Sequence, residues 1–366
     1  MHIQKNVILS TEKDQSIKLK DDLELLDMML IDSKSQPSLY HPGPYWVAKA
    51  KNAADEIKRC GIVDFRGSTS LIGLSYADNL YVDVRNAYNH GLRRLVRWLA
   101  NTYPLNRIYE SQVRWTELYA NESIIYAQEI LNIKKKTRDL LKKYTIPYSL
   151  LGKCLRKAEI DGRDYSTHYL DLLEQHDSIA SHINFNDAYS IFEIGGGFGA
   201  NIHLLLENYK NIRKVLYLDI SPNLYVGTQY LKAFYGTAVF DYRALKHLDS
   251  IKFSADNNIE IFCIAPWQIE KFESEIDIFM NSCSFVEMPK NVVKNYVSKF
   301  NKFPKSINTA IALTTYDGFN LNTTFHPNEL PKFFKDRKFD YFKVDRFLNS
   351  SRKNFFFVSP GKLSFQ

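Results

Sequence analysis

A glycine-rich segment in the middle of the chain holds the residues with the clearest chemical potential. An apolar run reaches Glu193 and leads into a loop containing Gly195, Gly197 and Gly199, after which a helical pattern begins. Glycine lets the backbone turn sharply and approach a ligand closely, and the first turn of a helix offers unpaired N–H groups to a polar or anionic group. A strand, a glycine loop and a helix in this order predict a nucleotide-type cofactor site rather than a plain turn.

Two cofactors fit such a loop. The run GGGFGA also satisfies the looser dinucleotide pattern, and Asp219, with Ile220 beside it at the expected end of the second strand, can accept hydrogen bonds from the ribose of either cofactor. Glu193 distinguishes the two, because a carboxylate just before the glycines suits the cationic methionine end of S-adenosylmethionine and repels a pyrophosphate. We therefore predict S-adenosylmethionine as the cofactor and keep a nicotinamide dinucleotide as the alternative.

Two later segments supply further candidate cofactor contacts. The third expected strand ends at Pro266 and Trp267, which offer an apolar wall for an adenine ring, although Trp267 suits a buried core position equally well. Asn281 lies at the end of the fourth expected strand. Since the carboxyl ends of parallel strands meet at one edge of a sheet, we expect these residues to lie near the glycine loop.

The elements that must position these residues follow from the hydrophobic pattern. From Tyr189 onward, short β-rich runs alternate with helical ones, which predicts βαβ units on a parallel sheet. The first half shows mainly helical periodicity, with helices expected at 21–31, 46–60 and between 88 and 144, and an ambiguous segment at 61–84. Strands are expected at 189–194, 214–219, 259–264, 276–281, 307–315, 340–347 and 354–358.

This pattern divides the chain into three parts. We predict a loose tail at 1–20, a mostly helical domain on the substrate side at 21–185, and a cofactor-binding catalytic domain with a Rossmann-like sheet at 186–366. The α/β fold class belongs to the C-terminal half.

Several of these segments together resemble one known group of enzymes. The runs EIGGGFG, LDIS, APW and DIFMNSCSFVEMP resemble the class I S-adenosylmethionine-dependent methyltransferases, and more narrowly the sugar O-methyltransferases of bacterial surface-polysaccharide clusters. PYW near Trp46 and VDFRG around Arg66 are similar to the helical part of that group, less specifically. The resemblance implies a class I methyltransferase sheet and O-methylation of a sugar hydroxyl in capsule or O-antigen biosynthesis, with a nucleotide-sugar, a lipid-linked glycan or a polymer as acceptor.

A sugar hydroxyl is a poor nucleophile at neutral pH, so methyl transfer to it gains from a base that removes its proton. Glu287, just past the fourth expected strand, is the first candidate, although a glutamate there could simply interact with the dipole of the next helix. Asp317 and His326 are the alternatives. The sequence shows no compact acidic cluster, so we predict no tightly held metal.

Composition and motif content indicate which classes of methyl acceptor the chain can bind. The net charge of +7 comes from basic residues spread along the chain, and the fourth strand lacks the Pro-Pro-aromatic run of amino-directed nucleic-acid methyltransferases. A nucleic-acid acceptor is therefore disfavoured, with RNA or small-molecule methylation kept as the alternative to a sugar. A nicotinamide-dependent sugar oxidoreductase and an inactive binding module are the remaining alternatives.

Cellular location follows from the cysteines and from hydropathy. The four cysteines form no CxxC pair, and neither a secretory signal nor a membrane-spanning run is visible, so we expect a cytoplasmic protein. The basic run at 134–143 predicts a solvated amphipathic helix, with peripheral membrane contact as the alternative. The pattern does not define an oligomeric state.

Overall fold

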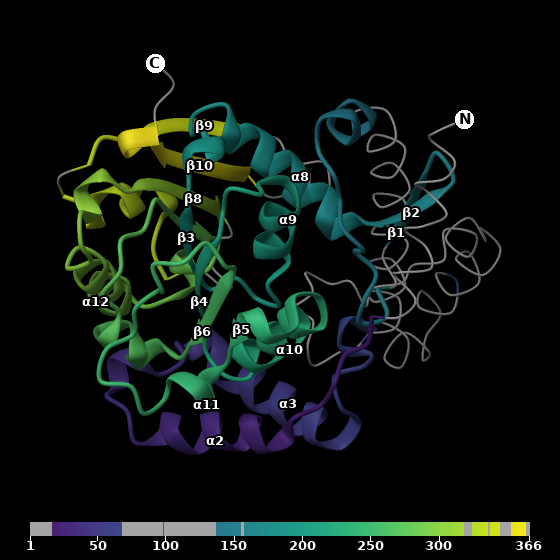
Figure 1. Ribbon diagram of the computed structural model, residues 1–366, viewed down its shortest axis with the longest axis vertical. Helices are drawn as coiled ribbons and strands as arrows, with labels where there is room; N and C mark the ends of the chain where they lie inside the picture. The colour runs from purple at the N-terminus through teal and green to yellow at the C-terminus, as the bar shows by residue number, and fades with distance from the viewer. Residues whose placement is uncertain are drawn as a thin grey trace.

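The computed structural model describes residues 17–67, 98, 137–154, 157–317, 324–335, 337–344 and 353–363. These residues form an eight-stranded sheet with the order β5-β6-β4-β3-β7-β8-β10-β9 (Figure 1). The strands from β5 to β8 are parallel, and β10 pairs antiparallel with both β8 and β9. Their bounds are β3 Ser190–Ile194, β4 Lys214–Leu218, β5 Val239–Phe240, β6 Glu260–Ile264, β7 Ile278–Ser282, β8 Ala310–Asp317, β9 Asp340–Val344 and β10 Lys353–Ser359.

The strand order confirms the predicted Rossmann-like sheet. When the two-residue edge strand β5 is set aside, the parallel strands β6-β4-β3-β7-β8 have the order 3-2-1-4-5 in chain sequence, which is the doubly wound order. The order reverses between β3 and β7. Open sheets of this kind bind ligands outside the carboxyl ends of the strands at such a reversal, so the glycine loop after β3 stands at the expected place.

Helices cover both faces of the sheet, which explains why the central strands are apolar on both sides. Figure 1 shows α8 (Thr167–Ala180) and α9 (Ala200–Asn208) on one side and α12 (Lys290–Phe300) on the other. Alternate residues of each strand enter two separate cores. Ile191 and Val215 pack with α8, α9 and α10 (Asn223–Tyr235), whereas Phe192 and Leu216 pack with α12.

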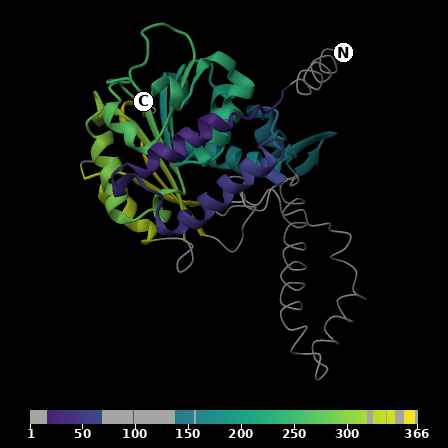
Figure 2. The ribbon, with the colours of Figure 1, turned by 90° about the horizontal axis from the view of Figure 1, so that it is seen from below.

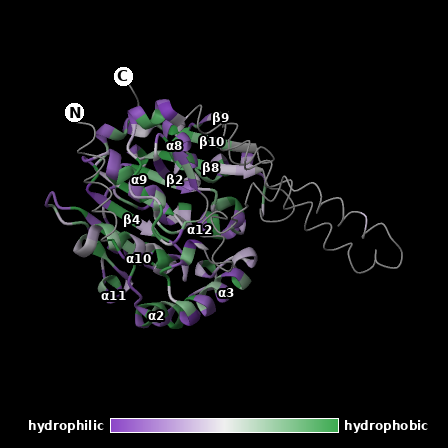
Figure 3. Cartoon of the chain, turned by 90° about the vertical axis from the view of Figure 1, so that its right-hand side faces the viewer, coloured by the Kyte–Doolittle hydropathy of each residue, from purple (hydrophilic) through white to green (hydrophobic). Residues whose placement is uncertain are grey.

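Two N-terminal helices, α2 (Leu23–Lys34) and α3 (Pro44–Cys60), lie side by side across the end of the molecule (Figure 2). Asp27 of α2 pairs with Lys58 of α3. In Figure 3, α2 shows both hydrophobic and hydrophilic residues beside α10 and α11 (Tyr242–Leu245), and its buried Leu25, Leu26 and Met29 belong to the same core as α9 and α10. The 3-10 helix η1 (Ser38–Tyr40) joins α2 to α3.

Most expected elements are present within a few residues. The predicted helices at 21–31 and 46–60 correspond to α2 and α3, and each of the seven predicted strands corresponds to a strand. Helix α10, after β4, begins at Asn223 and has Pro222 as its N-cap. Pro289 is the N-cap of α12.

Some predictions fall outside the described residues or remain open. The expected helices between 88 and 144 lie mostly outside them, and 137–143 is helical. Of the predicted tail, 1–16 also lies outside, whereas Leu19 is buried in the core. The domain boundaries stay predictions. The sequence interpretation missed β5 and the hairpin of β1 (Lys157–Ile160) and β2 (Arg163–Ser166).

Candidate functional site

The glycine loop takes a conformation that side chains would obstruct. Gly195, Gly197 and Gly199 have φ values of +72°, +61° and +85°, in the left-handed region that favours glycine. A Cβ on Gly195 would collide with Ser284, and one on Gly196 would lie 2.5 Å from Oε2 of Glu193. The loop therefore passes close to the ends of β3 and β7, and Gly199 serves as the N-cap of α9.

Glu193 lies in β3 beneath this loop and is 1% exposed. Its Oε1 accepts a hydrogen bond from Asn201 Nδ2 at 2.9 Å, while Oε2 is buried and accepts none from the residues that the structure describes. Burial raises the pKa of Glu193 to about 7, against the opposing effect of the Asn201 hydrogen bond. Buried acceptors are nearly always paired in folded proteins, so this oxygen is suited to a ligand donor.

Asp219 follows β4 and lies beside the same loop. Its Oδ2 accepts the N–H of Gly197 at 2.9 Å and its Oδ1 the N–H of Ile220 at 2.7 Å. Burial raises the pKa of Asp219 to about 8; the two backbone hydrogen bonds oppose this rise, and repulsion from Glu193 adds to it. The Asn223 side chain also bonds this carboxylate. An ionised carboxylate has about four acceptor sites, so not all of them are taken by these three donors. Ile220 acts here through its backbone.

The predicted aromatic wall lies at the end of β6. Pro266 begins the 3-10 helix η5 (Pro266–Lys271), and the half-buried Trp267 packs against both cores. Trp267 meets Tyr242 edge to face, with ring centroids 5.8 Å apart, and Tyr242 donates a hydrogen bond to Asp32 of α2 at 2.7 Å. Helix α2 is thereby tied to the same edge of the sheet.

Asn281, at the end of β7, braces the loop. Its Nδ2 donates to the carbonyl of Ile194 at 2.8 Å and to Ser284 Oγ at 2.6 Å, and its Oδ1 accepts the N–H of Phe285 at 3.0 Å. These bonds join the end of β3 to the turn after β7. The predicted direct contact of Asn281 with a cofactor stays a prediction.

Glu287 ends the 3-10 helix η6 (Phe285–Glu287) and receives donors from two distant segments. Tyr316 of β8 donates its hydroxyl to Oε1 at 2.7 Å, and Trp46 of α3 donates its indole N–H to Oε2 at 3.0 Å. The sequence interpretation singled out Glu287 and the PYW segment separately and missed this contact. It also missed Tyr316, for which the only sequence signal was its place next to Asp317.

The two alternative bases differ in how they are placed. Asp317 is the last residue of β8, and its side chain lies outside the described residues. His326 is exposed and is the N-cap of the 3-10 helix η8 (Pro327–Phe333), where its Nδ1 accepts the N–H of Asn328 at 3.2 Å. This geometry gives His326 a capping role.

The described part of the chain shows neither a metal-binding cluster nor a membrane-spanning helix. There, no group of three or more His, Cys, Asp or Glu side chains is arranged to hold a metal ion, and metal independence stays a prediction. None of the helices in the same residues has the length and apolar character needed to span a bilayer.

Comparison with known proteins gives matches only among solved structures. The chain matches no family model and no curated protein. A cyclopropane synthase from Mycobacterium tuberculosis aligns with a TM-score of 0.35 and 10% identity over 51% of this chain and 83% of its own. The 1,6-didemethyltoxoflavin-N1-methyltransferase of Burkholderia thailandensis, with bound S-adenosylhomocysteine, aligns with a TM-score of 0.37 and 11% identity over 53% and 80%.

A geranyl diphosphate C-methyltransferase from Streptomyces coelicolor, also with S-adenosylhomocysteine, has a TM-score of 0.34 and 10% identity over 53% of this chain and 80% of its own.

Proposed function

We propose that this chain is an S-adenosylmethionine-dependent methyltransferase. The observation that carries the proposal is the buried Oε2 of Glu193, which lacks a hydrogen-bond donor among the described residues beside a loop of left-handed glycines at the sheet reversal. A cationic amino group would supply both the donor and the compensating charge.

The charges around the loop favour this cofactor over a dinucleotide. Glu193 and Asp219 flank the loop, and each already disfavours ionisation of the other. A pyrophosphate beside them would disfavour ionisation of both groups further, whereas a cationic amino group would favour it. In the proposed complex Glu193 holds the methionine end, Asp219 the ribose hydroxyls, and Trp267 with Pro266 the adenine. When bound, S-adenosylmethionine supplies an electrophilic methyl group on its sulfonium.

We further propose that the acceptor is a sugar hydroxyl of a bacterial surface polysaccharide or its precursor. The support is the resemblance of the segment 277–289 to sugar O-methyltransferases, together with the position of Glu287 beyond β7 at the same edge of the sheet. Glu287 would accept the hydroxyl proton as the acceptor oxygen bonds to the methyl carbon, and the electron pair of the broken carbon–sulfur bond stays on sulfur. A small-molecule acceptor is the alternative.

Thermal melting with each cofactor tests the first proposal. S-adenosylhomocysteine at 100 times its dissociation constant should stabilise the native state by about 2.7 kcal/mol, whereas NAD and NADP should not raise the melting temperature. Glu193→Gln should weaken this response. Glu207→Gln, which removes a carboxylate from α9, the helix that follows the glycine loop, should retain it. A response to NAD alone would refute the assignment.

Transfer of labelled methyl groups tests the acceptor. Purified protein with S-adenosylmethionine should label a nucleotide-sugar, a lipid-linked glycan or a polysaccharide, and the product should release an O-methyl sugar on hydrolysis. Label found only in RNA or in a small molecule that is not a sugar would refute the sugar while leaving the cofactor assignment intact.

A further inference from the structure

The Glu287 carboxylate is held from two sides by parts of the chain that are far apart in sequence. Tyr316 Oη lies 2.7 Å from its Oε1 and Trp46 Nε1 lies 3.0 Å from its Oε2, so each oxygen accepts a bond from a neutral donor. The two donors come from the end of a sheet strand and from the first turn of an N-terminal helix.

We propose that Trp46 and Tyr316 are positioning residues that orient the Glu287 carboxylate and set its proton affinity, so that helix α3 completes the acceptor side of the site. This inference deepens the proposed function and rests on it. Neither residue need touch the substrate to act in this way.

The surroundings of Trp46 show that its indole is held in place. Its ring meets the Tyr45 ring edge to face at 5.3 Å, and Lys49 lies 4.1 Å over Tyr45 while bonding its hydroxyl. The chain before α3 packs closely on the turn after Glu287, because a Cβ on Gly43 would lie 3.0 Å from Cδ of Pro289. The indole N–H is therefore presented at a fixed point.

Tyr316, the second donor, and η6, which ends at Glu287, are also held in place. Tyr316 is buried in the core beneath α12, and its strand pairs with β7, which leads into η6. The N–H of Thr324 bonds the carbonyl of Val286 at 2.7 Å, which holds η6 from the side of the chain that follows β8. Rotation of the Glu287 carboxylate would break one or both donor bonds.

The expected chemical effect follows from the charge state that these donors favour. A hydrogen bond to the ionised form of a carboxyl group lowers its pKa, so the two donors keep Glu287 ready to accept a proton. Loss of one donor should therefore raise the pH at which Glu287 becomes competent as a base.

A different result is expected if the contacts of Glu287 only anchor α3 to the sheet. If Glu287 only fastened α3 to the sheet, loss of the Trp46 or Tyr316 donor would lower stability and activity at every pH alike. The pH profile separates the two roles, because it reports the protonation of essential groups in the free enzyme.

The experiment compares Trp46→Phe and Tyr316→Phe with Tyr45→Phe, which removes a neighbouring hydroxyl that bonds Lys49 instead. The acid limb of kcat/KM should move to higher pH by about 0.5–1 unit in the first two variants, and kcat at neutral pH should fall about 3- to 10-fold. Tyr45→Phe should leave the limb in place. Affinity for S-adenosylhomocysteine should remain within about twofold in all three variants. An unmoved limb in both test variants would overturn the proposal.

A second measurement needs no methyl transfer. The fluorescence difference between the wild-type protein and Trp46→Phe isolates the signal of Trp46, and it should change with pH as Glu287 gains a proton. This pH-dependent step in Trp46 fluorescence should vanish in Glu287→Gln and should move to higher pH in Tyr316→Phe. Absence of the step in wild-type protein would overturn this inference even if methylation is found, and its presence supports the inference even if another residue proves to be the base.

Discussion

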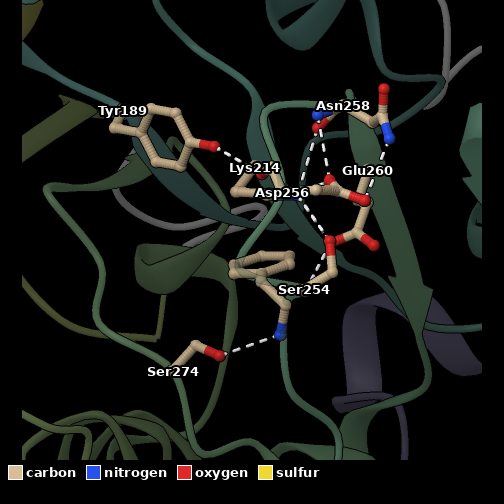
Figure 4. A network of polar contacts seen from close by, with 8 residues as sticks. Tyr189, Lys214, Ser254, Asp256, Asn258, Glu260 and Ser274 are labelled. Carbon is tan, nitrogen blue, oxygen red and sulfur yellow. Dashed lines mark hydrogen bonds and ion pairs between the residues drawn. The ribbon is translucent and has the colours of Figure 1, made fainter.

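The two ends of the same strands differ in how their buried charges are satisfied. At the amino end of β4, the buried Lys214 Nζ lies 3.0 Å from Ser254 Oγ and 3.0 Å from Glu260 Oε2, as well as 3.1 Å from the carbonyl of Asn258 (Figure 4). Asp256 completes this group, with Oδ1 3.2 Å from Nζ. Burial alone would lower the pKa of Lys214, but Glu260 and Asp256 raise it above its usual value.

Asp277, just before β7, repeats this arrangement at the amino end. Its Oδ2 accepts the N–H groups of Tyr189 and Ser190 at 2.8 and 2.9 Å, and Lys362 pairs with its other oxygen. Burial would raise the pKa of Asp277, but Lys362 and the two backbone donors bring it below its usual value. The charges at this end stabilise the fold.

At the carboxyl end of the strands, the effect of burial on the pKa values exceeds the effect of the neighbouring groups. Glu193 and Asp219 are buried at least as deeply as Asp277, yet their pKa values are raised, because burial disfavours the charged form and only hydrogen bonds oppose this effect. A buried charge without a counter-charge lowers the stability of the fold. Buried ionisable groups of this kind occur mainly at functional sites, where a ligand can supply the opposite charge. The contrast separates groups that serve the fold from groups that serve binding.

Glu287→Gln should give the largest effect, at the carboxyl end. It keeps the shape and removes the proton acceptor, so turnover on the true acceptor should fall by about 10²–10⁴-fold with cofactor affinity nearly intact. Steady-state kinetics and calorimetry check both parts. A fall below about fivefold would exclude Glu287 as the base and direct the test to Asp317 and His326.

Lys214→Met should give the largest effect at the amino end, on stability rather than on binding. It leaves Glu260 and Asp256 without their shared cation, and we expect a loss of about 2–4 kcal/mol in the free energy of unfolding. Denaturant unfolding measures this loss. Affinity for S-adenosylhomocysteine should be unchanged. A parallel loss of affinity would show that the amino end of the strands also contributes to cofactor binding.

Asp219→Ala tests whether the carboxyl end of the strands binds the cofactor. It removes up to two hydrogen bonds to ribose hydroxyls, so cofactor affinity should fall by about tenfold to a few hundredfold. Asp256→Ala removes a carboxylate at the opposite end and should leave affinity unaltered. Calorimetric titration of both variants compares them, and equal affinities would show that Asp219 does not hold the cofactor.

The smallest expected effect is the pH dependence of stability. Glu193 and Asp219 have folded-state pKa values of about 7 and about 8, against usual values of 4.5 and 3.8, so between about pH 4 and 8 the native state binds more protons than the unfolded state. The free energy of unfolding from these groups therefore falls as pH rises through that window.

We expect the melting temperature of the ligand-free protein to drop by about 2–5 °C between pH 6 and 8 on this account. Glu193→Gln, or saturating S-adenosylmethionine, should flatten the drop, since either removes or compensates a buried negative charge. Scanning calorimetry across this range provides the measurement. The same slope in Glu193→Gln would show that other groups control it.

Local patterns determined a large part of this protein. The strand, glycine loop and helix around Glu193 are neighbours in sequence, so their spacing alone predicted the turn and the carboxylate at the end of the strand before it. The alternation of β-rich and helical runs likewise predicted the parallel sheet, because each run reflects burial on one or both faces. The β1–β2 hairpin carried a usable signal that was missed, the Asp161–Gly162 turn with positive φ at both positions.

Only the tertiary structure decided which distant groups meet. Trp46, Glu287 and Tyr316 are brought together by the packing of α3 and by the pairing of β7 with β8, and nothing in their separate neighbourhoods indicates this contact. The same holds for the Lys214 group and for the Glu193 oxygen that no donor among the described residues reaches. Sequence shows that a charge is present but not which donors reach it. Sequence periodicity reports the average burial of a segment, whereas the partners of a buried polar atom depend on contacts across the whole fold.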